Sequence, residues 1–235
     1  MHPEEKRWHT VVDRVVEDWV GLTLPRPRVA IGEFVRTDGC SWCGVSLDSE
    51  IPCPCSASRL AWSRVFRLGG YAPPLSTCIL QGKYMAWPEM LELLGTDLGK
   101  RIKGCVPPWS VVVPVPMPPM RRWFRRIDHT DVIARYAARA SKLQFRKLLS
   151  RKNATPQAAL TATGRKALKR DSMRRRRLAS VRGRSIILID DVLTTGRTLE
   201  VAASTLRAEG AISVIVAVLA VTDMPGKAKN CDLRK

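Results

Sequence analysis

Two adjacent carboxylates and a cluster of threonines around one glycine are the residues of this chain whose types and spacing best suit chemistry. They come directly after the apolar run of residues 186–189. Carboxylates accept hydrogen bonds from sugar hydroxyls, whereas threonine hydroxyls and the free N–H groups at a helix start bind phosphate. A glycine in such a turn lets the backbone approach an anion closely. We therefore expect this stretch to bind a ribose 5-phosphate through Asp190, Asp191, Val192, Leu193, Thr194, Thr195, Gly196, Arg197 and Thr198.

A buried strand and an amphipathic helix are predicted to position these residues. Residues 186–189 are unbroken and rich in β-branched side chains, which is typical of a buried strand. From Leu199 to Leu206 the apolar residues recur with helical spacing, and Gly210 is a plausible helix end. An alternative without any ligand is a strand that ends in an Asp-rich turn, with a threonine as the helix cap.

The segment IILIDDVLTTGRT resembles the phosphoribosyl diphosphate (PRPP) motif of type I phosphoribosyltransferases. That motif is an apolar strand, two acids, two apolar residues and Thr-Thr-Gly-x-Thr, and every position is filled here. The resemblance implies that the 5-phosphate binds at 194–198 and that the ribose hydroxyls lie near the two acids. It also implies Mg²⁺, which would bridge oxygens of the diphosphate and the ribose.

Strands and helices alternate along much of the chain. We predict further strands at 111–116, 143–149 and 214–221, and helices at 8–20, at 85–102 with a break or start near Pro88, and at 130–140 with Thr130 as a possible cap. Residues 66–84 read as a mixed segment, and much of 150–184 reads as a mobile loop. This alternation predicts a parallel α/β sheet, whose ligands bind beyond the carboxyl ends of the strands.

Four cysteines in two close pairs lie upstream, at Cys40, Cys43, Cys53 and Cys55. Four thiolates can form a tetrahedral Zn²⁺ site, and Gly44 suits a tight turn after the first pair. Such a site leaves no open coordination position, so we expect a structural zinc ion without a catalytic role. The alternative is a cluster of buried or free thiols.

The positive charge of the chain is concentrated in one segment. Residues 121–184 hold 21 Lys and Arg against three acids, or +18 of the net charge of +19. A nucleic-acid contact is one interpretation, with single-stranded DNA as the partner and Arg174, Arg175, Arg176 and Arg177 as its densest part. The alternative is a solvated loop. The sequence has no apolar run long enough for a membrane span and no signal-peptide pattern at its start, so we expect a cytoplasmic protein with reduced thiols.

The cysteine ribbon, the PRPP motif and the segments between them together resemble the ComF competence family. Residues 125–130 resemble that family's segment after the VVVPVP strand, although Arg126 stands where glycine is usual and Asp128 where asparagine is usual. A second stretch of the family is matched by Arg151, Thr155, Gln157, Leu160 and Arg165. The resemblance implies a role in uptake of transforming DNA beside a DNA helicase. We expect the diphosphate near Pro116, Arg121, Arg122 and Arg125.

These observations predict a type I phosphoribosyltransferase fold with a small N-terminal zinc ribbon. We expect an N-terminal helix and linker (1–36), the ribbon (37–65), the phosphoribosyltransferase-like domain (66–224) and a polar tail (225–235). The expected function is that of a ComF-like protein that binds PRPP or ribose 5-phosphate and acts in competence and DNA uptake. The alternative is an active purine or pyrimidine phosphoribosyltransferase of nucleotide salvage. The sequence identifies neither an acceptor substrate nor a general base.

Overall fold

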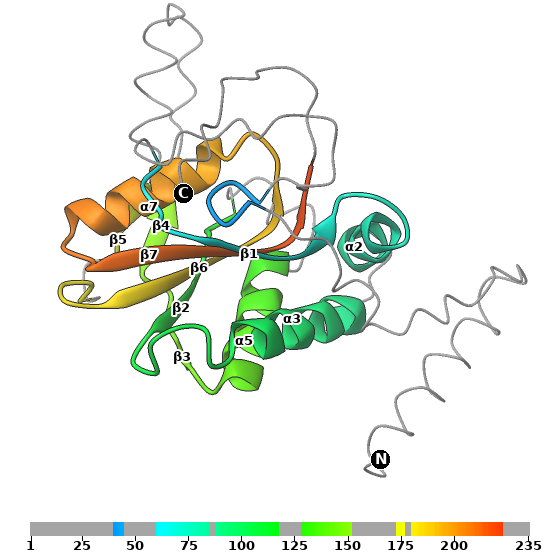
Figure 1. Ribbon diagram of the computed structural model, residues 1–235, viewed down its shortest axis with the longest axis horizontal. Helices are drawn as coiled ribbons and strands as arrows, with labels where there is room; N and C mark the ends of the chain where they lie inside the picture. Colours follow the sequence, from blue (N-terminus) through cyan, green and yellow to red (C-terminus); the bar gives the residue numbers. More distant parts are fainter. Residues whose placement is uncertain are drawn as a thin grey trace, which may run out of the picture. The chain divides into compact units, whose positions relative to one another are not determined.

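The computed structural model describes residues 40–44, 60–84, 88–117, 128–151, 173–176 and 180–222. Their centre is a five-stranded parallel sheet in the order β1-β7-β6-β2-β3 (Figure 1). The parallel α/β architecture predicted from the sequence is therefore confirmed. The elements are β1 (Val65–Gly70), α2 (Leu75–Tyr84), α3 (Pro88–Ile102), β2 (Val111–Pro114), α5 (His129–Ser141), β3 (Gln144–Phe145), β4 (Leu149–Arg151), β5 (Met173–Arg175), β6 (Ser185–Leu193), α7 (Arg197–Ala208) and β7 (Ser213–Val221).

Strand β6 lies in the middle of the sheet and is buried on both faces. Its side chains alternate between the two faces, as a strand requires. Ile186 and Leu188 pack in one apolar cluster, and Ile187 and Ile189 in the other. This two-sided burial explains why the strand reads as an unbroken apolar run.

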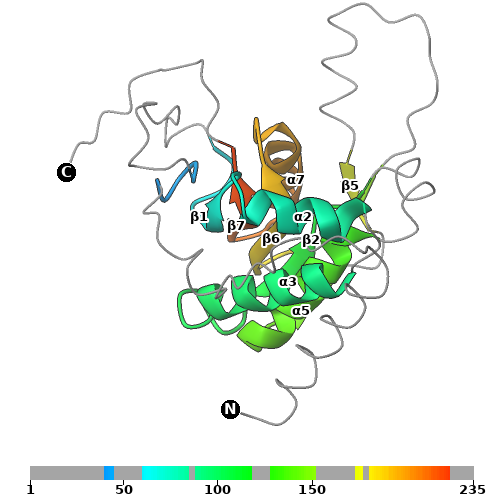
Figure 2. The ribbon, with the colours of Figure 1, turned by 90° about the vertical axis from the view of Figure 1, so that its right-hand side faces the viewer.

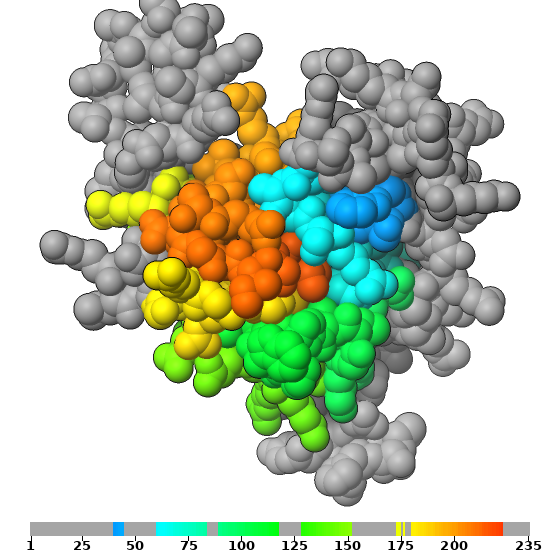
Figure 3. All heavy atoms as spheres, turned by 60° about the vertical axis from the view of Figure 1, so that its left-hand side comes forward, coloured from blue at the N-terminus to red at the C-terminus, as the bar shows by residue number. Residues whose placement is uncertain are grey.

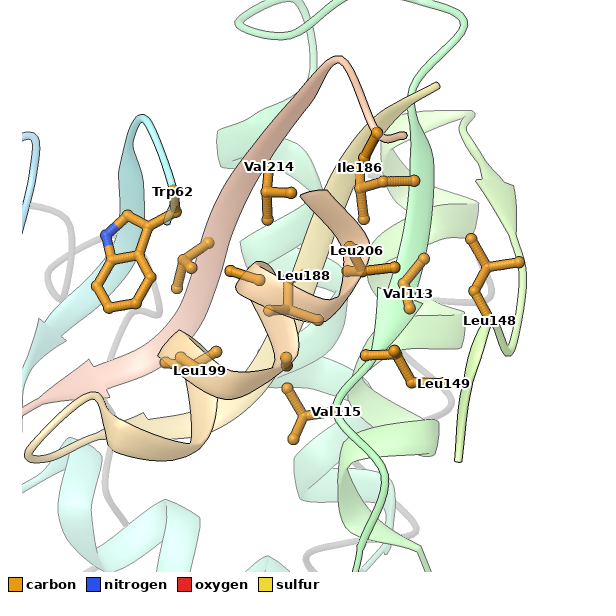
Figure 4. Packing of buried hydrophobic residues seen from close by; sticks show 14 of the residues in the cluster. Trp62, Val113, Val115, Leu148, Leu149, Ile186, Leu188, Leu199, Leu206 and Val214 are labelled. Carbon is orange, nitrogen blue, oxygen red and sulfur yellow. The ribbon is translucent and has the colours of Figure 1, made fainter. Parts of the chain in front are cut away.

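Helices cover both faces of the sheet. Helix α7 packs on the first face, where its Leu199 and Leu206 meet Leu188 and Val214 (Figure 4). Helices α2, α3 and α5 cover the second face, and α3 and α5 lie side by side (Figure 2).

The sequence prediction was incomplete before residue 85 and after residue 143. Residues 66–84 form strand β1 and helix α2 instead of a mixed segment. The single strand expected at 143–149 is two short strands, and β4 pairs in antiparallel fashion with β5, which lies within the predicted loop. The reason is tertiary, since Leu149 and Met173 are buried against the face that α7 covers.

Two further expectations concern helix starts and membranes. Helix α3 begins at Pro88, as predicted, but α5 is capped by Asp128 and not by Thr130. Among the described residues, no helix is both long and apolar enough to cross a membrane. The helix expected at residues 8–20 lies outside the described residues.

Candidate functional site

The chain reverses its direction of travel across the sheet between β2 and β6. From β2 it runs through α5 outward to β3, and from β6 it runs through α7 to β7 on the other side. The two helices lie on opposite faces of the sheet. In open α/β sheets, ligands bind in the crevice that such a reversal opens beyond the carboxyl ends of the strands.

A cavity of about 370 Å³ lies at this point. Its walls come from the ends of four parallel strands, from α2, from the first turns of α5 and α7, and from β4. Its lining is mainly polar and includes both acids of the motif. The lining residues are Tyr71, Lys83, Val115, Pro116, Met117, Thr130, Arg151, Asp190, Asp191, Val192, Thr194, Thr198 and Thr222.

The start of α7 forms one end of the cavity. Gly196 is the N-cap residue, with φ 69° and ψ −2°, a left-handed conformation that favours glycine. No side chain caps the helix, so the alternative of a threonine cap is wrong. The first intrahelical bond runs from the Glu200 N–H to the Gly196 carbonyl at 2.8 Å. The helix thus begins with backbone N–H groups and a positive dipole end that no side chain of the protein caps.

The two carboxylates lie within β6 and not beyond it, because the strand continues to Leu193. Asp191 uses both oxygens: Oδ1 accepts from the Val192 N–H at 2.6 Å, and Oδ2 pairs with Lys83 Nζ at 2.6 Å. Asp190 accepts from the Asp191 N–H at 2.9 Å. Asp191 is therefore fixed in place by its neighbours, whereas one oxygen of Asp190 has no bond within this trio.

Asp190 carries the strongest electrostatic signal of the site. Desolvation and the neighbouring Asp191 carboxylate raise the pKa of Asp190 from 3.8 to about 8. The Asp191 N–H and the charges of Lys83 and Arg151 act in the opposite direction. A carboxyl that is poorly solvated in the empty pocket is a good acceptor for sugar hydroxyls.

Arg151 connects β4 to the loop after β2. Its Nε donates to the Pro116 carbonyl at 2.8 Å, and its side chain lines the cavity. Lys83 and Arg151 thus bring two cations to a pocket that contains two acids. A ligand that combines anionic groups with hydroxyls matches this distribution.

The structure brings together most of the residues predicted for PRPP. Asp190, Asp191, Val192, Thr194 and Thr198 line the cavity. The remaining motif positions lie in or next to the turn without lining it, and Leu193 is buried in the core at 4 % exposure. For the diphosphate, Pro116 lines the cavity, and Arg121, Arg122 and Arg125 lie outside the described residues.

Sequence reasoning missed several lining residues, Lys83 above all. Lys83 belongs to α2, a helix that was not predicted, so nothing in the sequence aligned it with Asp191. Tyr71 follows the unpredicted strand β1. Thr222, in contrast, comes directly after a correctly predicted strand, and its position at the carboxyl edge could have identified it.

The first cysteine pair forms a tight turn. Gly44 has φ 75°, and its N–H donates to the Cys40 carbonyl at 2.8 Å. Cys40 and Cys43 are half-buried at this turn, while Cys53 and Cys55 lie outside the described residues. Among the residues that the structure describes, no group of three or more metal-binding side chains occurs. The zinc site stays a prediction.

The predicted nucleic-acid residues lie partly on β5. Arg174 and Arg176 are exposed. Arg174 pairs with Ser150 across the β4–β5 ladder, and the Arg176 N–H donates to the Leu148 carbonyl at 2.8 Å. Arg177 lies outside the described residues. The basic run is thus attached at one end to an ordered pair of strands.

The chain is similar to known proteins at two levels. The phosphoribosyl transferase domain family matches residues 133–233. The DNA utilization protein YhgH of Escherichia coli K12 is 32 % identical over 193 residues, which cover 77 % of this chain and 84 % of that protein. YhgH of Salmonella typhimurium is 28 % identical over 191 residues, with 77 % and 83 % of the two chains covered.

Solved structures are more distant. The glutamine PRPP amidotransferase of B. subtilis, complexed with ADP and GMP, shares 19 % identity, with a TM-score of 0.43 over 60 % of this chain and 30 % of that one. A hypoxanthine phosphoribosyltransferase of Staphylococcus aureus shares 13 % identity, with a TM-score of 0.36 over 59 % and 69 %. The assignment of the fold depends on the domain match and on the parallel sheet itself.

Proposed function

Because the chain belongs to the ComF family of proteins with a phosphoribosyltransferase-like domain, we propose that its cavity binds PRPP or a ribose 5-phosphate ligand. The observation that carries the proposal is the uncapped start of α7, which lies beside two carboxylates in one polar cavity. The function of the whole protein that we propose is a role in DNA utilization, after the name of its YhgH relatives.

Each part of the ligand has a matching surface. The N–H groups at the start of α7 and the hydroxyls of Thr194 and Thr198 suit the 5-phosphate. Asp190 suits the ribose hydroxyls, because its carboxylate is poorly solvated and would gain hydrogen bonds. The diphosphate suits the cationic side, where Arg151 lies on the Pro116 carbonyl.

Mg²⁺ fits the chemistry of this pocket, since carboxylate and diphosphate oxygens are the ligands that it prefers. When bound, it would neutralise charge on the diphosphate. Asp190 is the better placed of the two acids to approach it, because Asp191 is already paired with Lys83. In a transfer reaction, the protein's own contribution would be to position the ribose and to stabilise the leaving diphosphate.

Calorimetry with ribose 5-phosphate, and with PRPP in the presence of Mg²⁺, tests the proposal. Asp191→Ala and Thr198→Val should each weaken binding by about tenfold, the equivalent of about 1.4 kcal/mol. Thr205→Val is a matched control, since this threonine lies farther along α7 and bonds only the Val201 carbonyl. No binding of either ligand to the unaltered protein would refute the proposal. Consumption of PRPP with a panel of nucleobases and amines would distinguish an enzyme from a binding protein.

We also propose that Cys40, Cys43, Cys53 and Cys55 hold one structural Zn²⁺. The tight turn at the first pair supports this, because a glycine-stabilised turn brings two thiols close together. Metal analysis of the purified protein should find about one zinc ion per chain. Folded protein with reduced cysteines and no zinc would contradict it.

A second candidate function is binding of single-stranded DNA by the basic segment. It is supported by the net charge of +18 at residues 121–184 and by the exposure of Arg174 and Arg176. Affinity should fall with salt by about 0.7 in log–log slope for each phosphate contacted.

Replacing Arg174–Arg177 by serine should reduce that salt slope. The double change Lys100→Ser and Lys103→Ser, on and just after α3, removes exposed charge elsewhere and serves as the control. No binding at low salt, or a slope that the arginine changes leave unaltered, would refute a DNA-binding role.

A further inference from the structure

Trp62 packs against the loop that begins α7. The indole is buried at 4 % exposure, in the apolar cluster that includes Leu199 (Figure 4). A Cβ atom added to Gly196 would lie 3.2 Å from the indole Cη2 and 3.3 Å from Leu193 Cδ1. Trp62 is not part of the cavity wall, so it supports the loop without touching the space where a ligand would bind.

The indole is itself held by the cysteine turn. Trp62 Nε1 donates to the Trp42 carbonyl at 2.7 Å, and Trp42 lies between Cys40 and Cys43. The turn is in turn fixed to the sheet, because the Val65 N–H donates to the Ser41 carbonyl at 2.7 Å. Figure 3 shows residues 40–44 in blue against the segment that contains Trp62 and β1 in cyan.

A second bond joins the same segment to α7. The Ala61 N–H donates to Glu200 Oε2 at 3.1 Å. Glu200 lies in the first turn of the helix, and its own N–H closes the first helical bond to Gly196. Residues 61 and 62 therefore contact both the loop and the first turn of α7, although they lie more than 130 positions away in the sequence.

We propose that Trp62 is a positioning residue for the phosphate-binding loop, and that the Cys40–Gly44 turn acts on this loop through it. The proposal rests on the function proposed above. The indole limits Gly196 to the conformation in which α7 starts with free N–H groups. A glycine without such a neighbour has more backbone freedom than any other residue, so the loop would populate other conformations. Apparent affinity falls in proportion to the fraction of molecules in the competent conformation.

Trp62→Leu and Trp62→Phe test the proposal in the full-length protein. The leucine variant removes the ring from Gly196 and should weaken ribose 5-phosphate binding by tenfold or more. The phenylalanine variant keeps an aromatic ring but loses the bond to Trp42, and it should recover most of the affinity. Phe66→Leu is the control, because Phe66 is similarly buried at 6 % exposure but lies in the cluster on the other face.

Glu200→Ala and Glu200→Gln give a second, milder pair. Alanine removes the acceptor of the Ala61 N–H, and glutamine retains one. We expect a loss of affinity for the alanine variant only. This pair keeps the proposal testable where Trp62→Leu does not fold.

Hydrogen exchange of residues 194–199 without ligand separates this proposal from the ligand-binding proposal. Trp62→Leu should accelerate exchange in this loop, whereas Phe66→Leu should not. Faster exchange in a protein that binds no ribose 5-phosphate would refute the proposed function and retain the support by Trp62. Unchanged exchange in Trp62→Leu or Glu200→Ala, or an equal loss of affinity in Phe66→Leu, would overturn the positioning role.

Discussion

Two helices begin at the same edge of the sheet, and their first turns are built in opposite ways. Helix α5 follows β2, and the carboxylate of Asp128 caps it by accepting from the Asp131 N–H at 3.3 Å. Helix α7 follows β6 and begins at Gly196 with no side-chain cap. Both helix starts carry the same partial positive charge, so the difference lies in what neutralises it.

The α5 start is neutralised from within the protein. Asp131, in its first turn, pairs with Arg135 Nε at 2.9 Å and with Lys147 Nζ at 2.8 Å, so its carboxylate is held in place. At the α7 start the only acid of the first turn, Glu200, accepts from Ala61 instead. The comparison teaches that of these two helix starts only that of α7 is built to receive an external anion.

Gly196→Ala should have the largest effect on this comparison. The new Cβ would meet Trp62 and Leu193 at 3.2 and 3.3 Å, in a left-handed conformation that alanine rarely adopts. We expect ribose 5-phosphate binding to weaken by more than tenfold and the free energy of unfolding to fall by about 1 kcal/mol.

Gly183→Ala is the matched control, measured by the same calorimetry and denaturant titrations. Gly183 has φ 76°, and nothing lies within 4 Å of its added Cβ. It should cost similar stability and leave the affinity unchanged. Equal affinities for the two alanine variants would contradict the assignment of the loop.

Asp190→Asn should stabilise the ligand-free protein in a pH-dependent way. The pKa of Asp190 is raised from 3.8 to about 8, so the folded state holds a proton that the unfolded state releases. The stability that this proton provides is fully present below pH 3.8 and is lost as the pH rises to about 8. Asparagine stays neutral in both states, so its advantage should grow between pH 5 and pH 8.

We expect that advantage to reach about 1 kcal/mol or more at pH 8, since one pKa unit corresponds to about 1.4 kcal/mol. Thermal or denaturant unfolding at the two pH values measures it. Asp97→Asn is the control, because Asp97 lies on α3 and pairs with Lys100 at 3.1 Å, away from the cavity. A gain that is the same at both pH values would contradict the burial of charge at Asp190.

Asp128→Ala should have the smallest effect on binding. Loss of the N-cap should lower the free energy of unfolding by about 1 kcal/mol. Affinity for ribose 5-phosphate should stay within twofold, because the α5 start does not serve the ligand. A large loss of affinity without loss of stability would show that both helix starts contribute to the site.

The sequence revealed the part of the site that is contiguous in the chain. Residues 186–198 combine a strand, two acids and a helix start, and local pattern alone predicts each of them. It placed the acids after the strand, because it could not show that β6 continues beside β7 until the Thr222 N–H bonds the Leu193 carbonyl at 2.9 Å.

The parts of the site that depend on tertiary packing escaped prediction. Lys83 reaches Asp191 only because α2 packs on the second face of the sheet, and α2 itself shows little amphipathic pattern. Trp62 supports Gly196 across more than 130 positions of sequence. Neither contact has a local signal, since no spacing rule connects the two partners.

The most direct test of the account is a crystal structure of the protein with ribose 5-phosphate. The account predicts the phosphate at the N–H groups of Arg197, Thr198 and Leu199, with Thr194 beside it and the ribose hydroxyls at Asp190. The start of α5 should hold no phosphate. A phosphate bound between Lys83 and Arg151, with the start of α7 left free, would contradict the central claim.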